Sequence, residues 1–155
     1  MDGGFHQYRL SSGPGLYVYP TNKFKTTLVR LVIHTNLEEE TTKTALVPFV
    51  LRRGTRVHPD NLTLARFCEE LYGAQLYADV FKIGERQLVQ FTLSVLNDRY
   101  ISAEVDLLSQ GLELLREVVY DPLVINDGFN PSYVETESRN LREKIRGLIK
   151  DKRQY

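Results

Sequence analysis

The residues best suited to metal or nucleophile chemistry are three histidines, His6, His34 and His58, and one cysteine, Cys68. A helix that binds a metal through two histidines places them three or four positions apart, and no two of these are so close. A site that uses all three needs long-range folding, and polar or surface roles are the simpler interpretation. Cys68 falls on the apolar side of a helical pattern, which is typical of a buried, unreactive thiol.

Serine, glycine and lysine do not form the known reactive loops. The segment Ser-Ser-Gly-Pro-Gly at 11–15 lacks the strand-to-helix setting of a hydrolase nucleophile and the lysine of a phosphate-binding loop, so a turn is the better interpretation. A single cysteine also excludes an internal disulfide and a metal site of several thiolates.

Clustered carboxylates and tyrosines offer binding groups rather than a catalytic set. Glu38–Glu40, Glu69–Glu70 and Glu135 with Glu137 could attract a cation, but acidic residues at helix starts and on solvated helix faces explain them equally. Tyr72 and Tyr77 are the candidates for lining a peptide groove, although tyrosine is also common in half-buried sheets. Residue types and spacing alone therefore reveal no active site.

Composition indicates a folded protein without an anionic partner. The chain has 155 residues, of which 42% are apolar and 26% charged, and its 20 basic residues balance 20 acidic ones. Phosphate binding needs a basic excess or a basic face, so nucleic acid and anionic membranes are not expected partners. No apolar run approaches the length of about 20 residues that spans a membrane, and we expect a cytoplasmic protein.

Turn residues and period-two alternation predict two β-hairpins and one further strand. The hairpin strands are Tyr8–Leu10 with Leu16–Tyr19, and Gln75–Lys82 with Gln87–Leu96. The last of these alternates apolar and polar residues, which predicts one buried and one solvated face. Phe24–His34 has apolar residues on both sides, which predicts a strand covered on both faces.

Four helices follow from the charge and apolar patterns. They are predicted over 37–53, 59–72, 104–120 and from Pro131 onward. Pro48 should kink the first helix. The last helix has an apolar stripe formed by Val134, Leu141, Ile145 and Leu148. Because strands and helices come in pairs, we predict an α+β fold, with a largely antiparallel sheet and helices mainly on one face.

Two segments carry a resemblance to a known family. Residues 44–55 (TALVPFVLRRGT) and residues 71–78 (LYGAQLYA) resemble the metal-site helix and the following turn and strand of the pitrilysin and mitochondrial-processing-peptidase family of zinc peptidases, the inverzincins. Two later features of the family also occur here. An amphipathic helix ends near a Pro-Leu pair, Pro122-Leu123, and a glutamate-rich helix begins just after an aromatic residue, Phe129. The resemblance covers nearly the whole chain and implies a LuxS/processing-peptidase-like lobe. It is greatest to the non-catalytic bacterial members associated with elongation factor P modification.

The resemblance fails at the residues that carry the chemistry. The family helix has His-x-x-Glu-His, and the matching positions here are Ala45, Pro48 and Phe49. The distal glutamate ligand falls near Lys144, with Glu143 one position away. Zinc peptidases hold the metal with imidazoles and a carboxylate and use a glutamate as base, and Ala, Pro and Phe supply none of these groups. The resemblance therefore implies no zinc in this chain, although active relatives contain it.

Three functions stay open at this point. The first is a non-catalytic peptidase-like lobe, residues 1–155, that belongs to a longer two-lobe protein and binds peptide or a partner. The implied partner is an active peptidase relative in a homo- or hetero-oligomer. The second is an active zinc peptidase whose ligands come from elsewhere, such as His34 or His58 with glutamates. The third is a purely structural half of a hetero-oligomer.

Overall fold

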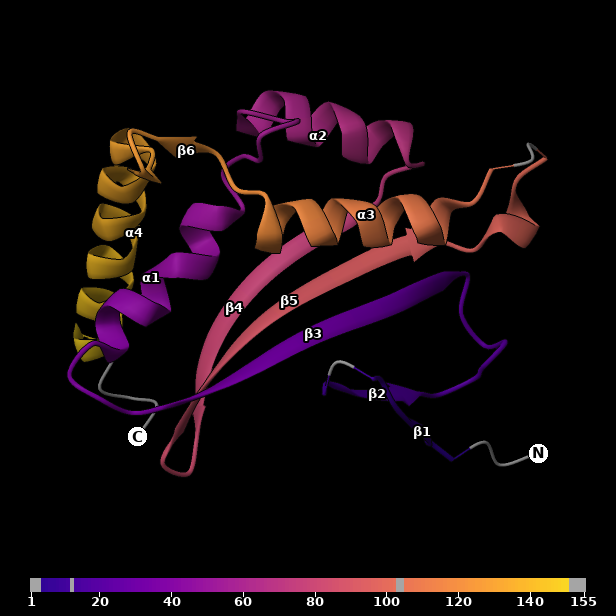
Figure 1. Ribbon diagram of the computed structural model, residues 1–155, viewed down its shortest axis with the longest axis horizontal. Coiled ribbons are helices and arrows are strands. Elements are labelled where there is room, and N and C mark those ends of the chain that lie inside the picture. Colours follow the sequence, from indigo (N-terminus) through magenta and orange to yellow (C-terminus); the bar gives the residue numbers. More distant parts are fainter. Residues whose placement is uncertain (1–3, 12, 103–104, 151–155) are drawn as a thin grey trace.

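The computed structural model describes residues 4–11, 13–102 and 105–150, with the side chains of 148–150 outside the described part. Its centre is an antiparallel sheet of three strands, with β5 (Arg86–Leu96) between β3 (Thr26–Asn36) and β4 (Gln75–Ile83). The helices gather on one face of this sheet (Figure 1). The predicted α+β class with an antiparallel sheet is confirmed.

The central strand β5 has the predicted period-two pattern. Phe91, Leu93 and Val95 are buried, while Gln90, Thr92 and Ser94 between them remain partly accessible. Successive side chains of a strand point to opposite faces, so the three apolar residues form the floor beneath the helices. The sheet therefore has one face in the core.

Helix α3 (Leu107–Tyr120) lies directly on this floor. The Asp106 side chain caps its start by accepting a hydrogen bond from the Ser109 backbone. Gly111 allows the close approach, because a Cβ at this position would lie 2.7 Å from Val95 Cγ1. The predicted start at Glu104 lies outside the described residues.

Three other helices complete this layer. They are α1 (Thr41–Leu51), α2 (Asn61–Glu70) and α4 (Pro131–Lys150). Asp60 caps α2 together with Thr63, and Pro131 begins α4 as predicted. The first helix begins later than predicted, because Glu38–Glu40 form a turn that precedes Thr41. It continues through Pro48 to Leu51.

Two small hairpins lie outside the main sheet. β1 (His6–Arg9) pairs with β2 (Gly15–Val18), as predicted for the first hairpin. β6 (Val124–Ile125) pairs with β7 (Gly128–Phe129) in a segment predicted to be loop. Figure 1 shows β1 and β2 on the opposite side of the sheet from the helices.

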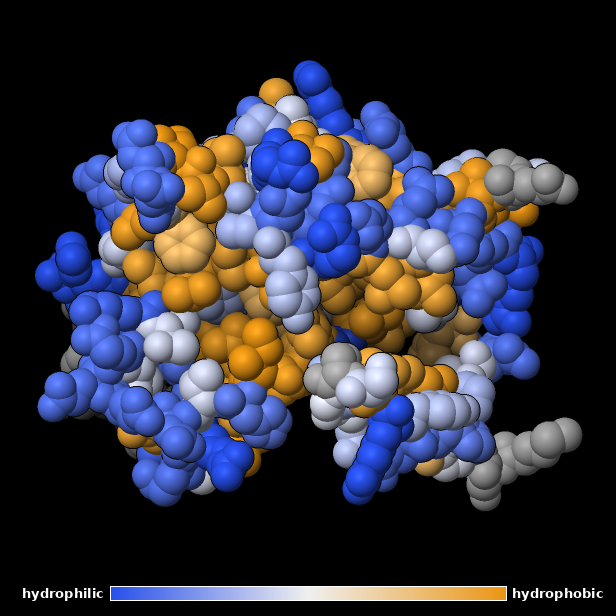
Figure 2. All heavy atoms as spheres, in the orientation of Figure 1, coloured by the Kyte–Doolittle hydropathy of each residue, from blue (hydrophilic) through white to orange (hydrophobic). Residues whose placement is uncertain are grey.

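The prediction for Phe24–His34 is wrong in one respect. β3 pairs only with β5, and Leu28 is 53% exposed on the face turned away from the helices, where Val32 is also exposed. No helix covers that face within the part of the chain that the structure describes. Figure 2 shows apolar surface in the middle of the view, between the hairpin and the helical end.

The end of α4 is only partly covered. Leu141 is half-buried, Ile145 is 44% exposed, and the side chain of Leu148 lies outside the described part. Among the described residues, no helix is both long and apolar enough to cross a membrane.

Candidate functional site

The positions matched to a metal site lie where α1 packs against α4 (Figure 1). The start of α1 is fixed by the buried side chain of Gln87 on β5. Its amide nitrogen donates to the Thr41 carbonyl at 3.0 Å, and its amide oxygen accepts from the Thr35 hydroxyl at 3.3 Å. This contact ties the first turn of α1 to two strands and so orients the helix over the sheet.

The residues at these positions are inert. Pro48 is fully buried, Ala45 and Phe49 are half-buried, and the Lys144 ammonium on α4 lies 6.0 Å from the centre of the Phe49 ring. That distance is within the range of a cation–π contact. A methyl group, a pyrrolidine ring, a phenyl ring and an ammonium offer no electron pair to a metal. These residues therefore do not fit a zinc ion.

An ion pair joins the other end of α1 to α4. The Arg53 guanidinium donates to the carboxylate of Glu137, whose side chain is 11% exposed, and Asn140 also donates to that carboxylate at 3.3 Å. A buried carboxylate needs such partners, because desolvation of an unpaired charge is costly. Glu137 is therefore a structural residue rather than a solvated one.

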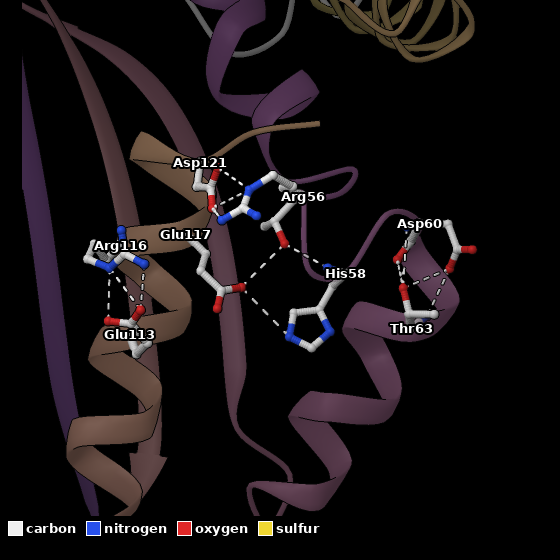
Figure 3. Close-up of polar contacts among 9 residues, drawn as sticks. Arg56, His58, Asp60, Thr63, Glu113, Arg116, Glu117 and Asp121 are labelled. Atoms are coloured by element: carbon white, nitrogen blue, oxygen red, sulfur yellow. Dashed lines mark hydrogen bonds and ion pairs between the residues drawn. The ribbon is translucent and has the colours of Figure 1, made fainter. Parts of the chain in front are cut away.

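The loop between α1 and α2 holds the other polar cluster, which Figure 3 shows against α3. The fully buried Thr55 hydroxyl accepts from the His58 backbone at 2.9 Å and donates to Glu117 at 3.3 Å. His58 Nε2 lies 3.7 Å from the same carboxylate, and its ring stacks on Phe67. Gly54 makes the loop tight, since a Cβ there would lie 2.6 Å from the Pro59 carbonyl oxygen.

A second contact secures this loop to the end of α3. The Arg56 guanidinium donates to both carboxylate oxygens of Asp121, at 2.9 Å and 2.7 Å, and its backbone donates to the Asp121 carbonyl at 3.0 Å. Hydrogen bonding to Arg56 lowers the pKa of the Asp121 carboxyl. Thr55, His58 and Glu117 resemble a nucleophile–base–acid set by residue type. However, the burial of the Thr55 hydroxyl leaves no room for substrate, so the cluster holds the loop.

The histidines do not come together. His58 lies beside Glu117, whereas His34 is on the exposed face of β3 and His6 is on the separate hairpin. Among the described residues no three His, Cys, Asp or Glu side chains are close enough to hold a metal. The structure therefore offers no assembled site for the alternative in which His34 or His58 binds zinc with glutamates.

A cleft of about 470 Å³ lies beside the start of β4. Its walls include Arg52 after α1, Glu69 on α2, and Gln75 and Tyr77 on β4. Tyr72 is exposed in the preceding turn with a φ of 56°, and it is not among the residues that line the cleft. Cys68 also lines it, and burial raises the pKa of this thiol. The cleft therefore lies between the end of α1, helix α2 and the start of β4, and no described residue of α4 lines it.

Comparisons with known proteins bear on this arrangement. No protein-family model matches the chain. Over 140 residues, 90% of the chain, it is 38% identical to the "Probable inactive metalloprotease YmfF" of Bacillus subtilis (strain 168). The chain is similar to a protein named as an inactive metalloprotease. A conserved protein from Enterococcus faecalis V583, known from a crystal structure, matches 89% of the chain with a TM-score of 0.83 and 27% identity.

The matched region is only part of each relative. It covers 33% of the Bacillus protein and 32% of the Enterococcus chain, so the present chain spans about a third of their length. The likeness therefore concerns the described sheet and helices, and the activities of the whole relatives are a separate question.

Proposed function

We propose that this chain is a non-catalytic, peptidase-like lobe that binds an extended peptide or a partner protein. One observation carries the proposal. The positions matched to the ligands and base of a zinc peptidase hold Ala45, Pro48, Phe49 and Lys144, and the last two contact each other. The name of the Bacillus relative, an inactive metalloprotease, agrees with a protein of this kind.

The cleft beside β4 supplies a place for a peptide. β4 pairs only with β5 among the described strands, so its other edge is free where Gln75 and Tyr77 line the cleft. A free strand edge presents backbone donors and acceptors, and extended peptides bind such edges as an added strand. Arg52 and Glu69 on the walls would then contact charged side chains of the peptide.

The partner in this proposal is an active peptidase relative, joined with the present lobe in a hetero-oligomer. A lobe that binds peptide without cutting it contributes to hydrolysis only through a second subunit that carries the metal. The corresponding lobe of the longer inverzincin proteins is N-terminal, and we assign residues 1–155 to that lobe. Because Tyr77 lines the cleft and Tyr72 does not, Tyr77 is the tyrosine that would contact the bound peptide.

A zinc experiment tests the absence of catalysis. After equilibrium dialysis against zinc and removal of free metal, elemental analysis should find far less than one zinc per chain. Peptide hydrolysis should be undetectable, and a chelator should leave Tm unchanged, since no bound metal supports the fold. One tightly held zinc per chain, lost together with peptide cleavage on chelation, would refute the proposal.

A binding experiment tests whether the cleft beside β4 binds peptide. Fluorescent peptides of about ten residues, long enough to add one strand, are titrated with the protein and followed by anisotropy. Tyr77→Ala and Arg52→Glu should each weaken binding several-fold. Tyr120→Ala is the matched control, because Tyr120 is also exposed but lies at the end of α3 outside the cleft. Equal loss in the control, or no binding by the unaltered chain, would contradict a peptide site here.

A further inference from the structure

A second hollow lies between α1 and α4. It has a volume of about 460 Å³ and is lined by residues of these two helices only. Leu46 from α1 and Leu141 and Ile145 from α4 form its apolar floor. It shares no lining residue with the cleft beside β4. We call this hollow the α1–α4 groove.

The rim of the α1–α4 groove is cationic. Lys43, Arg142 and Arg146 lie along it, and no acidic residue is among its lining residues. Lys43 is paired with Glu40 at 2.6 Å. Arg142 and Arg146 make no ion pair with any residue in the described ranges. The groove thus combines an apolar floor with two arginines that have no ion-pair partner among the described residues.

Part of this charge has a local explanation. Basic residues near the C-terminus of a helix stabilise it by opposing the helix dipole, and Arg146 lies near the end of α4. The dipole does not explain why an exposed isoleucine and a half-buried leucine face the same groove. A solvated basic helix end would carry polar residues at Leu141 and Ile145.

We infer that the α1–α4 groove binds an amphipathic helix of another protein, with apolar anchors on one face and acidic residues beside them. The groove between two packed helices accepts a third helix, whose side chains fit between the two ridges. Anchors at positions i, i+3 or i+4 and i+7 would reach Leu46, Leu141 and Ile145. Glutamates flanking the anchors would then meet Arg142 and Arg146.

The charge pattern argues against a second copy of this chain as the occupant. The described second half of α4, residues 141–147, carries Arg142, Lys144 and Arg146 against a single acidic residue, Glu143. Two such helices brought together at the groove would repel. The proposed partner is therefore acidic, and this inference does not depend on peptide binding in the cleft beside β4.

The probe is a designed, fluorescein-labelled peptide of about 18 residues, long enough to form a helix when bound. It has leucine at the a and d positions and glutamate at e and g, and a companion peptide has lysine in place of glutamate. The unaltered chain should bind the glutamate peptide in anisotropy titrations and bind the lysine peptide at least about tenfold more weakly. Added salt should weaken the first interaction.

Variants locate the binding. Arg142→Glu/Arg146→Glu should reduce affinity for the glutamate peptide at least about tenfold and improve binding of the lysine peptide. Ile145→Asn, which changes no charge, should also weaken binding. Arg9→Glu/Lys23→Glu is the control, since it makes the same change in net charge at exposed positions in and after the N-terminal hairpin. Circular dichroism checks that each variant is folded.

Three results would overturn the inference. They are no binding of the glutamate peptide, equal affinity for both peptides, and binding unaffected by Arg142→Glu/Arg146→Glu. Arg52→Glu in the other cleft should leave affinity for this helical probe unchanged. Failure of the groove and failure of the proposed peptide site are therefore distinguishable.

Discussion

Replacing Glu137 by leucine tests whether an ion pair fixes α1 on α4. Removal of one partner from a buried ion pair costs about 3–5 kcal/mol, because the remaining charge stays desolvated. Two features would reduce this cost for the remaining Arg53. Its side chain is 25% exposed to water. In addition, the Asn61 amide, oriented with its oxygen toward Arg53, accepts a hydrogen bond from the guanidinium at 2.8 Å. We therefore expect Glu137→Leu to lower the free energy of unfolding by about 2–3 kcal/mol.

The double variant gives the sharper result. Arg53→Met/Glu137→Leu removes both charges and leaves apolar side chains of similar volume, so its loss should stay below about 1 kcal/mol. Urea denaturation measures both values, and a loss of 2–3 kcal/mol should lower Tm by about 5–10 °C in a chain of this size.

The control for this pair is an exposed one. Arg116→Met/Glu113→Leu alters a surface pair on α3, where both side chains are more than half exposed. The change should leave the free energy of unfolding nearly unaltered, because water screens an exposed pair. An effect of Glu137→Leu as mild as that of this control would refute a stabilising role for the buried pair. A double variant that lost as much stability as Glu137→Leu would also refute it, since no unpaired charge remains in the double variant.

Three further predictions concern packing, pH and the thiol. Gly111→Val should lower the free energy of unfolding by about 1–3 kcal/mol, because the new side chain would overlap Val95. Gly147→Ala on α4 should raise it by about 0.5–1 kcal/mol, because a Cβ there has nothing within 4 Å. Thermal unfolding of the two variants measures both changes. Arg56 lowers the folded pKa of Asp121, so this contact stabilises the fold above the unfolded pKa of about 3.9 and is lost as pH falls through the folded pKa. Tm should therefore fall less steeply with acid in Asp121→Asn than in the unaltered chain, and equal slopes would exclude the contact as a contributor. Burial raises the pKa of the Cys68 thiol, so its maleimide labelling should reach half its maximal rate at a higher pH than for a free cysteine, and urea should abolish the difference.

Local patterns predicted the three strands of the main sheet, the N-terminal hairpin and the four α-helices, but not the short hairpin of β6 and β7. The alternation in 87–96 identified β5 and its buried face, and Pro131 begins α4 as predicted. The neighbours of an element were harder to predict. Apolar residues on both sides of Phe24–His34 suggested cover on both faces, yet β3 is an edge strand with an exposed face. Periodicity reports which residues avoid water, but it does not identify what covers them.

The polar cluster around Thr55 had no signal in the sequence. Thr55 and Glu117 are 62 positions apart, and a threonine after glycine in a loop is ordinary. Only the packing of the loop on α3 gives the buried hydroxyl its carboxylate partner. His58, a candidate metal ligand by residue type, lies instead beside the Glu117 carboxylate and stacks on the Phe67 ring.

Helices α1 and α4 carry the residues that replace a metal site, and two contacts between side chains join these helices. Arg53 with Glu137 and Lys144 with Phe49 join the two helices at separate points, so the helix pair does not need a metal for its cohesion. Burial of an aromatic ring is favourable, whereas an assembled metal site requires polar groups to be desolvated before the metal binds. Apolar and ionic contacts thus hold the two helices together. The cleft beside β4 and the α1–α4 groove are the two hollows on which the proposed binding roles rest.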